Sequence, residues 1–470
     1  MLRLRALASL LLAGTLLGAA APARLPAQVT AGGQQGPGAA AAPGAGEQLR
    51  VYLATYGQGG AVWELFGHNS LWLQDARTGR TRSYNWGSFS FHQPGFLPRL
   101  IRGSMLYWLA VNDAEEEVAY YRDVNRSITV QELNLSPAQE LELQRFVEWN
   151  ALPEHMFYEY HYFRDNCSTR VRDALDRVLG GQLAQQLQAI KTRETFRSHS
   201  LRLTARAPLT YTGIELGLAD SADHPLTAWE EAFVPMELML RLRSVQVSSP
   251  GGGTPPLVAS EVPLFVSSRP PPLAAAPNRV PLYLLLGVLI GLLFVLLARL
   301  SGLLEHRSRA AGRPVRAGWA RWLLALSAAA WSLVVGFFGL LVLLLWTATG
   351  HTFTYGNENL LQVNPLSLLL VALVPIALLA RRAGRAARLA ALATASLSVL
   401  GLLLKVLPGF DQMNHDIIAL MVPAHLGMLA SLQLMLYRGR DMATSPAEGR
   451  RMGSHARAGM KAAPPRGEAM

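Results

Sequence analysis

The chain has little charge and almost no cysteine. Of its 470 residues, 16% are charged and 50% are hydrophobic, and cysteine occurs once, at Cys167. A single cysteine excludes an internal disulfide bond, so this thiol is not a structural crosslink. The length suffices for a folded core, but the composition is too apolar for a wholly soluble protein. We therefore expect a folded domain joined to a membrane region.

The first apolar run is short for a bilayer span. Arg3 and Arg5 precede an apolar stretch at 6–19, which small residues follow, and this order is typical of a secretory signal peptide. The small residues favour cleavage after Ala23 or Ala27. No cysteine follows either position directly, so the mature chain is not expected to be a lipoprotein itself. An uncleaved anchor is the less favoured alternative.

Composition divides the rest of the chain. Two stretches are rich in Gly, Pro and small residues and have no means of packing, which is typical of linkers. The predicted segments are a signal peptide at 1–27, a flexible linker at 28–47, a folded domain at 48–247, a Pro/Gly-rich linker at 248–278, a transmembrane domain at 279–440 and a disordered tail at 441–470.

Five apolar runs predict about five transmembrane helices. They lie near 280–298, 323–346, 366–380, 389–407 and 417–437, and the third is short. The connections at 351–365 and 408–416 have no Lys or Arg, whereas arginines crowd the other connections and the C-terminus. The positive-inside rule then places the arginine-rich loops and the C-terminus in the cytoplasm, and the signal peptide places the folded domain outside. The two arguments agree.

The net charge of +11 has the same explanation. Most arginines outside residues 80–245 lie between or after the apolar runs, so we interpret the excess as membrane topology and expect no nucleic-acid partner. The polar loops 351–359 and 411–416 should share one side of the membrane with the folded domain. They either contact a lipid-borne substrate or are solvated connectors. Asp411, His415 and Asp416 lack a further ligand, so no metal site and no cofactor are expected.

Cys167 is predicted to begin a helix. From Val171 onward, apolar residues recur with the spacing of one helix face, and Gly180 and Gly181 close the pattern. Asp165 and Asn166 are good N-caps, so the sulfur would lie among free N–H groups that favour an anion and lower a thiol pKa. The inert alternative is a small buried hydrophobic residue.

His68 is the predicted base for this thiol. A strand ending near Gln74, a turn at 75–80 and a returning strand from Thr81 to Trp86 predict a hairpin that sets His68 roughly opposite residues 85–88. Asn85 is then the predicted orienting residue, and Glu64 competes for that role. A base, an orienting group and a later nucleophile make up the machinery of covalent catalysis. A structural role is the alternative for His68.

Three motifs carry a family resemblance. At Phe66-Gly67-His68, at 84–89 and at 166–173, the chain resembles the Lnb-type periplasmic domain, named after a bacterial lipoprotein N-acyltransferase. The resemblance covers about residues 48–243, and the membrane half is also similar. It implies an α+β permuted papain-like (NlpC/P60-like) fold, with Cys167 as nucleophile and His68 as base. Asn166, Ser168 and Arg170 are the expected supporting residues near the oxyanion.

The resulting hypothesis is a cysteine acyltransferase of the bacterial inner membrane. Cys167 would take an acyl chain from a membrane phospholipid or lipoprotein as a thioester and pass it to an amine, most plausibly a lipoprotein N-terminus. Papain-like scaffolds also support other reactions. A cysteine peptidase or amidase acting on cell-wall peptides is therefore the main alternative, and a non-catalytic membrane scaffold is the third.

Overall fold

The computed structural model describes residues 48–248, 252–313 and 318–437, which form two compact units. The first, called the sheet unit here, runs to Asn278 and adds Val342–Glu358 and Leu407–Asn414. The second, the helical unit, holds the remaining helices of the apolar half. The predicted signal peptide, the first linker and the C-terminal tail lie outside the described residues.

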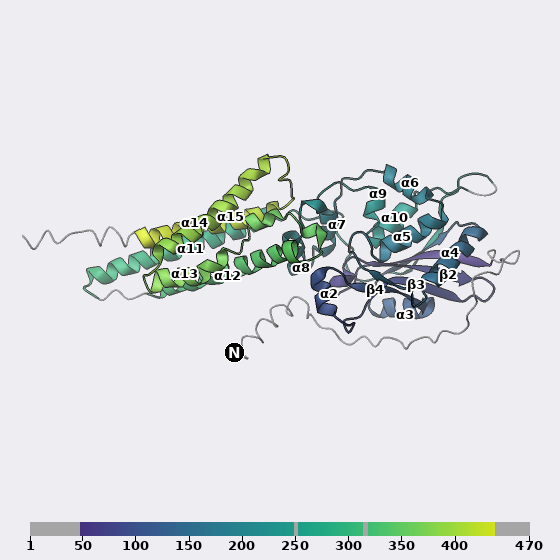
Figure 1. The fold of residues 1–470 in the computed structure, drawn as a ribbon, viewed down its shortest axis with the longest axis horizontal. Coiled ribbons are helices and arrows are strands. Elements are labelled where there is room, and N and C mark those ends of the chain that lie inside the picture. Colours follow the sequence, from purple (N-terminus) through teal and green to yellow (C-terminus); the bar gives the residue numbers. More distant parts are fainter. Residues whose placement is uncertain (1–47, 249–251, 314–317, 438–470) are drawn as a thin grey trace, which may run out of the picture. The chain divides into compact units, whose positions relative to one another are not determined.

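A seven-stranded sheet forms the centre of the sheet unit (Figure 1). Its order is β6-β4-β3-β2-β1-β5-β7, and all paired neighbours are antiparallel. The predicted hairpin is present, with Leu71 opposite Tyr84. The strands are β1 (Leu49–Tyr56), β2 (His68–Asp75), β3 (Thr81–Ser88), β4 (Leu106–Asp113), β5 (Ile128–Leu133), β6 (Phe157–Glu159) and β7 (Val258–Phe265).

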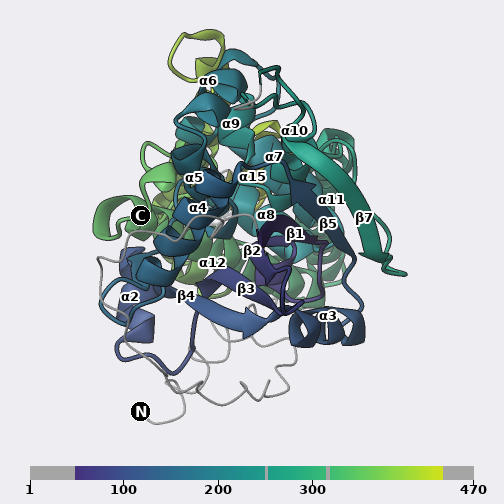
Figure 2. The same ribbon diagram turned by 90° about the vertical axis from the view of Figure 1, so that its right-hand side faces the viewer.

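Helices cover both faces of this sheet. Figure 2 shows α4, α5 and α10 over one face and α3 at the other. Ser136 and Gln139 form a capping box at the start of α4. The helices are α2 (Phe96–Arg102), α3 (Ala114–Asp123), α4 (Pro137–Asn150), α5 (Cys167–Val178), α6 (Gln182–Ala189), α7 (Phe196–Thr204), α8 (Pro208–Gly217), α9 (Ala228–Glu231) and α10 (Pro235–Leu242).

Alternation along β2 separates two cores. Leu71 and Leu73 point to the face that α5 covers and pack in the larger core. Ser70 and Trp72 point to the opposite face, where Trp72 packs with Ala114 and Tyr121 of α3. Side chains on this second face therefore contact α3. His68 is two residues before Ser70 on β2, so it lies on the same face.

The predicted linker at 248–278 contains a strand. β7 pairs with β5 from Val258 to Phe265 and closes one edge of the sheet. The surrounding Pro and Gly residues concealed it, because a strand with Pro263 inside is tolerated only where one side of the strand is free. The sheet unit extends to Asn278, beyond the predicted end of the folded domain at 247.

The helical unit contains a helix at each of the five predicted apolar runs. Four are long and apolar enough to cross a membrane, whereas α13 has 13 residues, or about 20 Å of helix. The mixed α/β domain is thus followed by a region with four apolar membrane-length helices. The helices are α11 (Val280–Ala310), α12 (Trp319–Ala348), α13 (Ser367–Leu379), α14 (Gly384–Leu403) and α15 (His415–Tyr437).

Glycines allow α11 and α15 to pack closely. A methyl group on Gly287 would lie 2.3 Å from the carbonyl oxygen of Leu420, and one on Gly427 would lie 2.2 Å from Cα of Gly291. Gly287 and Gly291 are four residues apart on one face of α11, a spacing that lets the backbones of membrane helices approach each other.

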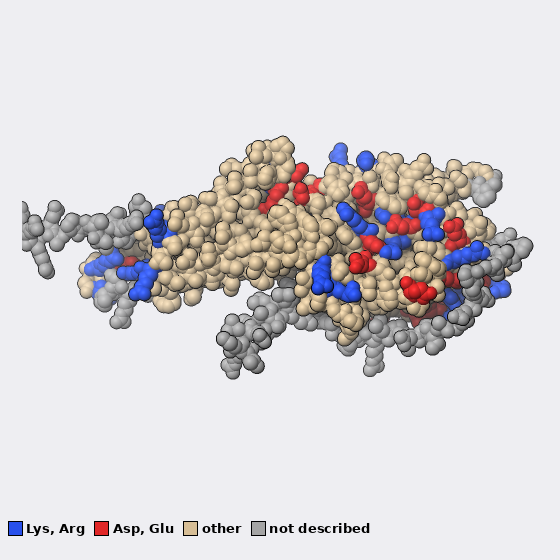
Figure 3. All heavy atoms as spheres, in the orientation of Figure 1, with Lys and Arg blue, Asp and Glu red and all other residues tan. Residues whose placement is uncertain are grey.

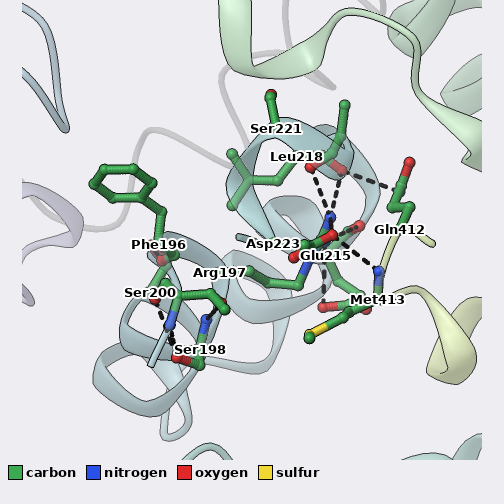
Figure 4. Close-up of polar contacts among 12 residues, drawn as sticks. Phe196, Arg197, Ser198, Ser200, Glu215, Leu218, Ser221, Asp223, Gln412 and Met413 are labelled. Atoms are coloured by element: carbon green, nitrogen blue, oxygen red, sulfur yellow. Dashed lines mark hydrogen bonds and ion pairs between the residues drawn. The ribbon is translucent and has the colours of Figure 1, made fainter. Parts of the chain in front are cut away.

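The two loops without Lys or Arg are anchored to the sheet unit. Arg197 of α7, almost fully buried, pairs with Asp223 at 2.6 Å and with Glu215 at 3.8 Å. Asp223 then accepts the N–H of Met413, and Gln412 donates to the carbonyl oxygen of Leu218 (Figure 4). The loop that holds Gln412 and Met413 is therefore bonded to the sheet unit and is not only a solvated connector. Both loops belong largely to the compact unit that holds Cys167.

Candidate active site

Cys167 is the first residue of α5, as predicted. The Asn166 side chain accepts the N–H groups of Ser168 at 2.9 Å and Thr169 at 3.0 Å and so caps the helix. The other end of the Asn166 amide donates to the carbonyl oxygens of Tyr162 and Phe233. These four bonds fix the helix start, and with it the position of the thiol, which is 9% exposed.

His68 and Cys167 flank one glycine. Gly87 has a φ of +100°, and a methyl group placed on it would lie 3.1 Å from Cβ of Cys167 and 3.3 Å from Cε1 of His68. A side chain there would fill the space between thiol and imidazole, and a positive φ also favours glycine. The backbone N–H of Asn69, next to His68, acts to lower the pKa of the Cys167 thiol. The structure thus brings together two residues that are about a hundred positions apart in the sequence.

Asn85 links His68 to a buried carboxylate. His68 Nε2 and Asn85 Oδ1 are 2.6 Å apart, and Asn85 Nδ2 donates to Glu117 Oε1 at 2.5 Å. Because a carboxylate only accepts, the Asn85 amide must turn its oxygen toward His68, and Nε2 must carry the imidazole proton. The lone pair of His68 is then on Nδ1.

Glu117 is held by neutral donors alone. Its Oε2 accepts from Tyr56 at 2.7 Å, from Trp72 at 3.2 Å and from Ser70 at 3.3 Å. The residue is 6% exposed and has no ion pair among the described residues. Four hydrogen bonds replace the water that a buried carboxylate loses. Glu117 therefore lies behind Asn85 as the acceptor of a group of neutral donors.

Burial determines the protonation of the pair. Desolvation raises the pKa of the Cys167 thiol to about 11, although the N–H groups of Asn69, Ser168 and Cys167 itself act in the opposite direction. Desolvation also lowers the pKa of His68 to about 4, although the hydrogen bond that His68 donates to Asn85 acts in the opposite direction. The expectation of a lowered thiol pKa was wrong, because loss of water outweighs the helix start. The resting pair is a neutral thiol and a neutral imidazole.

The other predicted site residues contact different groups. Glu64 lies 3.6 Å from Arg126 and accepts the N–H of Ala61 at 3.0 Å, so Asn85 and not Glu64 contacts His68. The Ser168 hydroxyl donates to the carbonyl oxygen of Ala232 at 2.6 Å. Arg170 pairs with Asp165 and lies over the Tyr158 ring at 4.3 Å. Ser168 and Arg170 thus stabilise the helix start through their side chains.

A row of aromatic side chains runs from the surface toward Cys167. Trp63 and Phe91 are about half exposed, with ring centroids 5.5 Å apart, and Phe91 lies 5.0 Å from Phe89. Phe89 stacks on Tyr107 at 5.0 Å, and Tyr107 stacks on Tyr160 at 4.1 Å. A thiolate at Cys167 would raise the pKa of both tyrosines, beyond the larger effect of their burial. The inner end of the row therefore lies within the electrostatic range of the sulfur.

An apolar helix continues this surface. Leu97 and Ile101 of α2 are 54% and 51% exposed. The end of α2 is bonded to the segment that directly follows α12, because Gly350 donates to the carbonyl oxygen of Arg102 at 2.7 Å and His351 lies 3.0 Å from that of Leu100. The exposed apolar side chains of α2 thus belong to a helix that is bonded to the segment directly after α12, a helix of membrane length.

The candidate site lies in a region that matches the model of a known family. Residues 45–205 match the family model of the Lnb N-terminal periplasmic domain. The match includes Cys167, His68, Asn85 and Glu117. It leaves the apolar helices outside. No curated protein and no solved structure matches the chain. The chain thus combines a region similar to the Lnb N-terminal periplasmic domain with four helices of membrane length, as expected of a membrane-associated protein.

Sequence reasoning missed one residue of the candidate site, Glu117. Glu117 follows Glu115 and Glu116, and such a run is typical of a solvated first turn. It also falls three residues after Ala114 and four before Tyr121, which puts it on the buried stripe of α3. A carboxylate on an apolar stripe was the available signal. Within the described residues, no three His, Cys, Asp or Glu side chains are placed to hold a metal ion.

Proposed function

We propose that this protein is a membrane-anchored acyltransferase that carries an acyl group on Cys167. In the first half reaction, His68 Nδ1 takes the thiol proton as the sulfur attacks an ester carbonyl carbon of a membrane lipid or lipoprotein. The carbon–oxygen ester bond then breaks, and the imidazolium returns the proton to the departing alkoxide. The products are an acyl thioester and a free hydroxyl group.

The second half reaction is aminolysis. A free amine attacks the thioester carbonyl, His68 accepts its proton, and the sulfur departs and is reprotonated. The acceptor we propose is the α-amine at the N-terminus of a lipoprotein. Water must be kept from the thioester, and a thiol that is 9% exposed beside stacked aromatic rings suits that need.

The proposal depends most on one observation, the thiol next to an imidazole whose tautomer a buried carboxylate sets through Asn85. The row from Trp63 to Tyr160 supports an apolar substrate, because stacked rings line the approach with apolar surface. The N–H groups of Asn69 and Cys167 are our candidates for the oxyanion hole. Asn166, Ser168 and Arg170 then act as positioning residues at the helix start.

We further propose that the sheet unit has a permuted papain-like arrangement, in which a histidine on a strand precedes a cysteine at a helix start. Its periplasmic placement would leave the arginine-rich helix ends and the C-terminus in the cytoplasm. A reporter fused after Arg440 tests this topology. A cytoplasmic readout is expected. A periplasmic readout would mean that the proposed number of membrane spans is wrong.

Mass spectrometry of lipoprotein N-termini tests the function in cells. Cells with the wild-type protein should show N-acylated lipoproteins, and cells that lack it or carry Cys167→Ala should show free amines. Unchanged N-termini in all three would refute the proposal. If peptide turnover in the cell wall falls in Cys167→Ala cells while lipoproteins stay unchanged, the peptidase alternative is correct. If neither lipoprotein N-acylation nor peptide turnover changes, the non-catalytic membrane scaffold is the alternative that is left.

A further inference from the structure

A second site of distinct chemistry lies within the helical unit. An open crevice of about 800 Å³ is formed between α11, α14 and α15. Its polar lining comes from three arginines and one glutamine, and leucines form much of the rest. These residues include Arg299, Arg385, Arg388, Gln433, Leu389 and Leu429.

The arginines of the crevice lack carboxylate partners. No Asp or Glu lines the crevice, and none of the three pairs with a carboxylate in the described part of the chain. The nearby arginines of α11 and α12 differ. Arg321 pairs with Glu305 at 2.6 Å, and Arg309 lies 3.8 Å from the same residue. The charge of the crevice is thus left for a ligand, while that of its neighbours is partly neutralised within the protein.

The crevice changes from charged to apolar along its helices. On α14, Arg385 and Arg388 occupy the first turns, and Leu389 and Leu392 follow on the same face. On α11, Val295 lies one turn before Arg299, toward the apolar middle of the helix. Figure 3 shows Lys and Arg gathered at one end of the helical unit, beside a stretch free of charged side chains. A charged mouth above apolar walls fits a molecule with an anionic head and hydrocarbon chains.

We propose that this crevice binds one anionic phospholipid, with its phosphate on the three arginines and its acyl chains along the leucines. Basic pockets between membrane helices recognise such head groups. Along α14 and α15, the crevice lies at the ends remote from the loop Leu407–Asn414, which belongs to the sheet unit. In the topology proposed above, the arginine-rich helix ends are cytoplasmic, so the ligand would occupy the cytoplasmic leaflet. The inference does not depend on the acyltransferase reaction.

Native mass spectrometry of the full-length protein in mild detergent tests this site. Phosphatidylglycerol, phosphatidylcholine and inorganic phosphate are each added at equal concentration. The wild type should retain one phosphatidylglycerol, and neither phosphatidylcholine nor phosphate should compete with it. Equal retention of phosphatidylcholine would overturn the proposed selectivity. Displacement of the lipid by phosphate alone would overturn the role of the apolar walls.

A matched pair of variants separates the site from general charge. Arg385→Gln with Arg388→Gln removes two crevice arginines, and Arg381→Gln with Arg382→Gln removes two exposed arginines just before α14. Each crevice arginine should contribute about fivefold to the apparent affinity, so the first pair should bind roughly 25-fold more weakly and the control should be unchanged. Equal losses in both pairs would overturn the proposal. Should the crevice pair unfold, Arg299→Gln alone must still give the fivefold loss.

Discussion

Two buried carboxylate clusters in the sheet unit serve different ends. Glu117 is surrounded by four neutral donors, whereas Asp223 and Glu215 share the cation of Arg197. In the first cluster, Glu117 orients the amide of Asn85, and this amide in turn orients the imidazole of His68. The second is neutralised internally and uses its remaining acceptors to hold a loop (Figure 4). A buried carboxylate can therefore orient a base or fasten a segment, depending on whether its charge is compensated.

Among the substitutions that test this comparison, removal of the Arg197 cation should have the largest effect on stability. Arg197→Met removes the cation that two buried carboxylates share and should reduce the free energy of unfolding by about 3–5 kcal/mol. Arg243→Met is the control, because it breaks a pair of partly exposed side chains worth about 0–1 kcal/mol. Denaturant unfolding in detergent measures both. Equal effects would mean that the Arg197 cluster does not stabilise the unit.

The neutral state of the catalytic pair is tested by alkylation. With its pKa near 11, the Cys167 thiol should react with iodoacetamide about 100-fold more slowly at pH 7 than a thiol of ordinary pKa, and its rate should rise with pH toward that value. An imidazolium–thiolate pair would instead react at a constant rate from about pH 5 upward. A plateau near neutral pH would refute the assignment of neutral groups.

Glu117→Gln breaks the orienting cluster without changing its size. A glutamine amide must aim its own donor at Asn85 or at the group of Tyr56, Ser70 and Trp72, so one buried donor loses its acceptor, at a cost of about 1–3 kcal/mol. If Asn85 rotates, it offers a donor to His68 and reverses the tautomer. The loss of acylation rate, expressed as a free energy, should therefore exceed the loss in the free energy of unfolding. Glu115→Gln, exposed on the same helix, should change neither.

The smallest change tests the space between thiol and imidazole. Gly87→Ala and Gly79→Ala both place a side chain at positive φ, at a cost of about 1–3 kcal/mol each, but nothing lies within 4 Å of the new methyl group at Gly79. Only the change at Gly87 should also slow acylation. Equal activity of the two variants would remove Gly87 from the site.

Local signals in the sequence explain which features could be predicted. The hairpin that carries His68 depends on a turn at 75–80, and the start of α5 depends on the cap Asn166, both within a few residues. Glu117 depends on α3 folding back over β2 and β3, a tertiary contact that no local pattern encodes. Strand β7 likewise depends on a partner, β5, about 130 residues earlier. The raised pKa of the thiol needed the burial that only the packed sheet supplies.

The most direct test of the account is mass spectrometry of the intact protein after incubation with a lipid ester donor. The wild type should gain one acyl mass on Cys167, and hydroxylamine should release it. His68→Ala and Cys167→Ala, each shown to be folded and inserted, should gain none. An acyl group on Cys167 at the wild-type rate in the absence of His68, or an acyl group on another residue, would contradict the assignment of this thiol and imidazole as the catalytic pair.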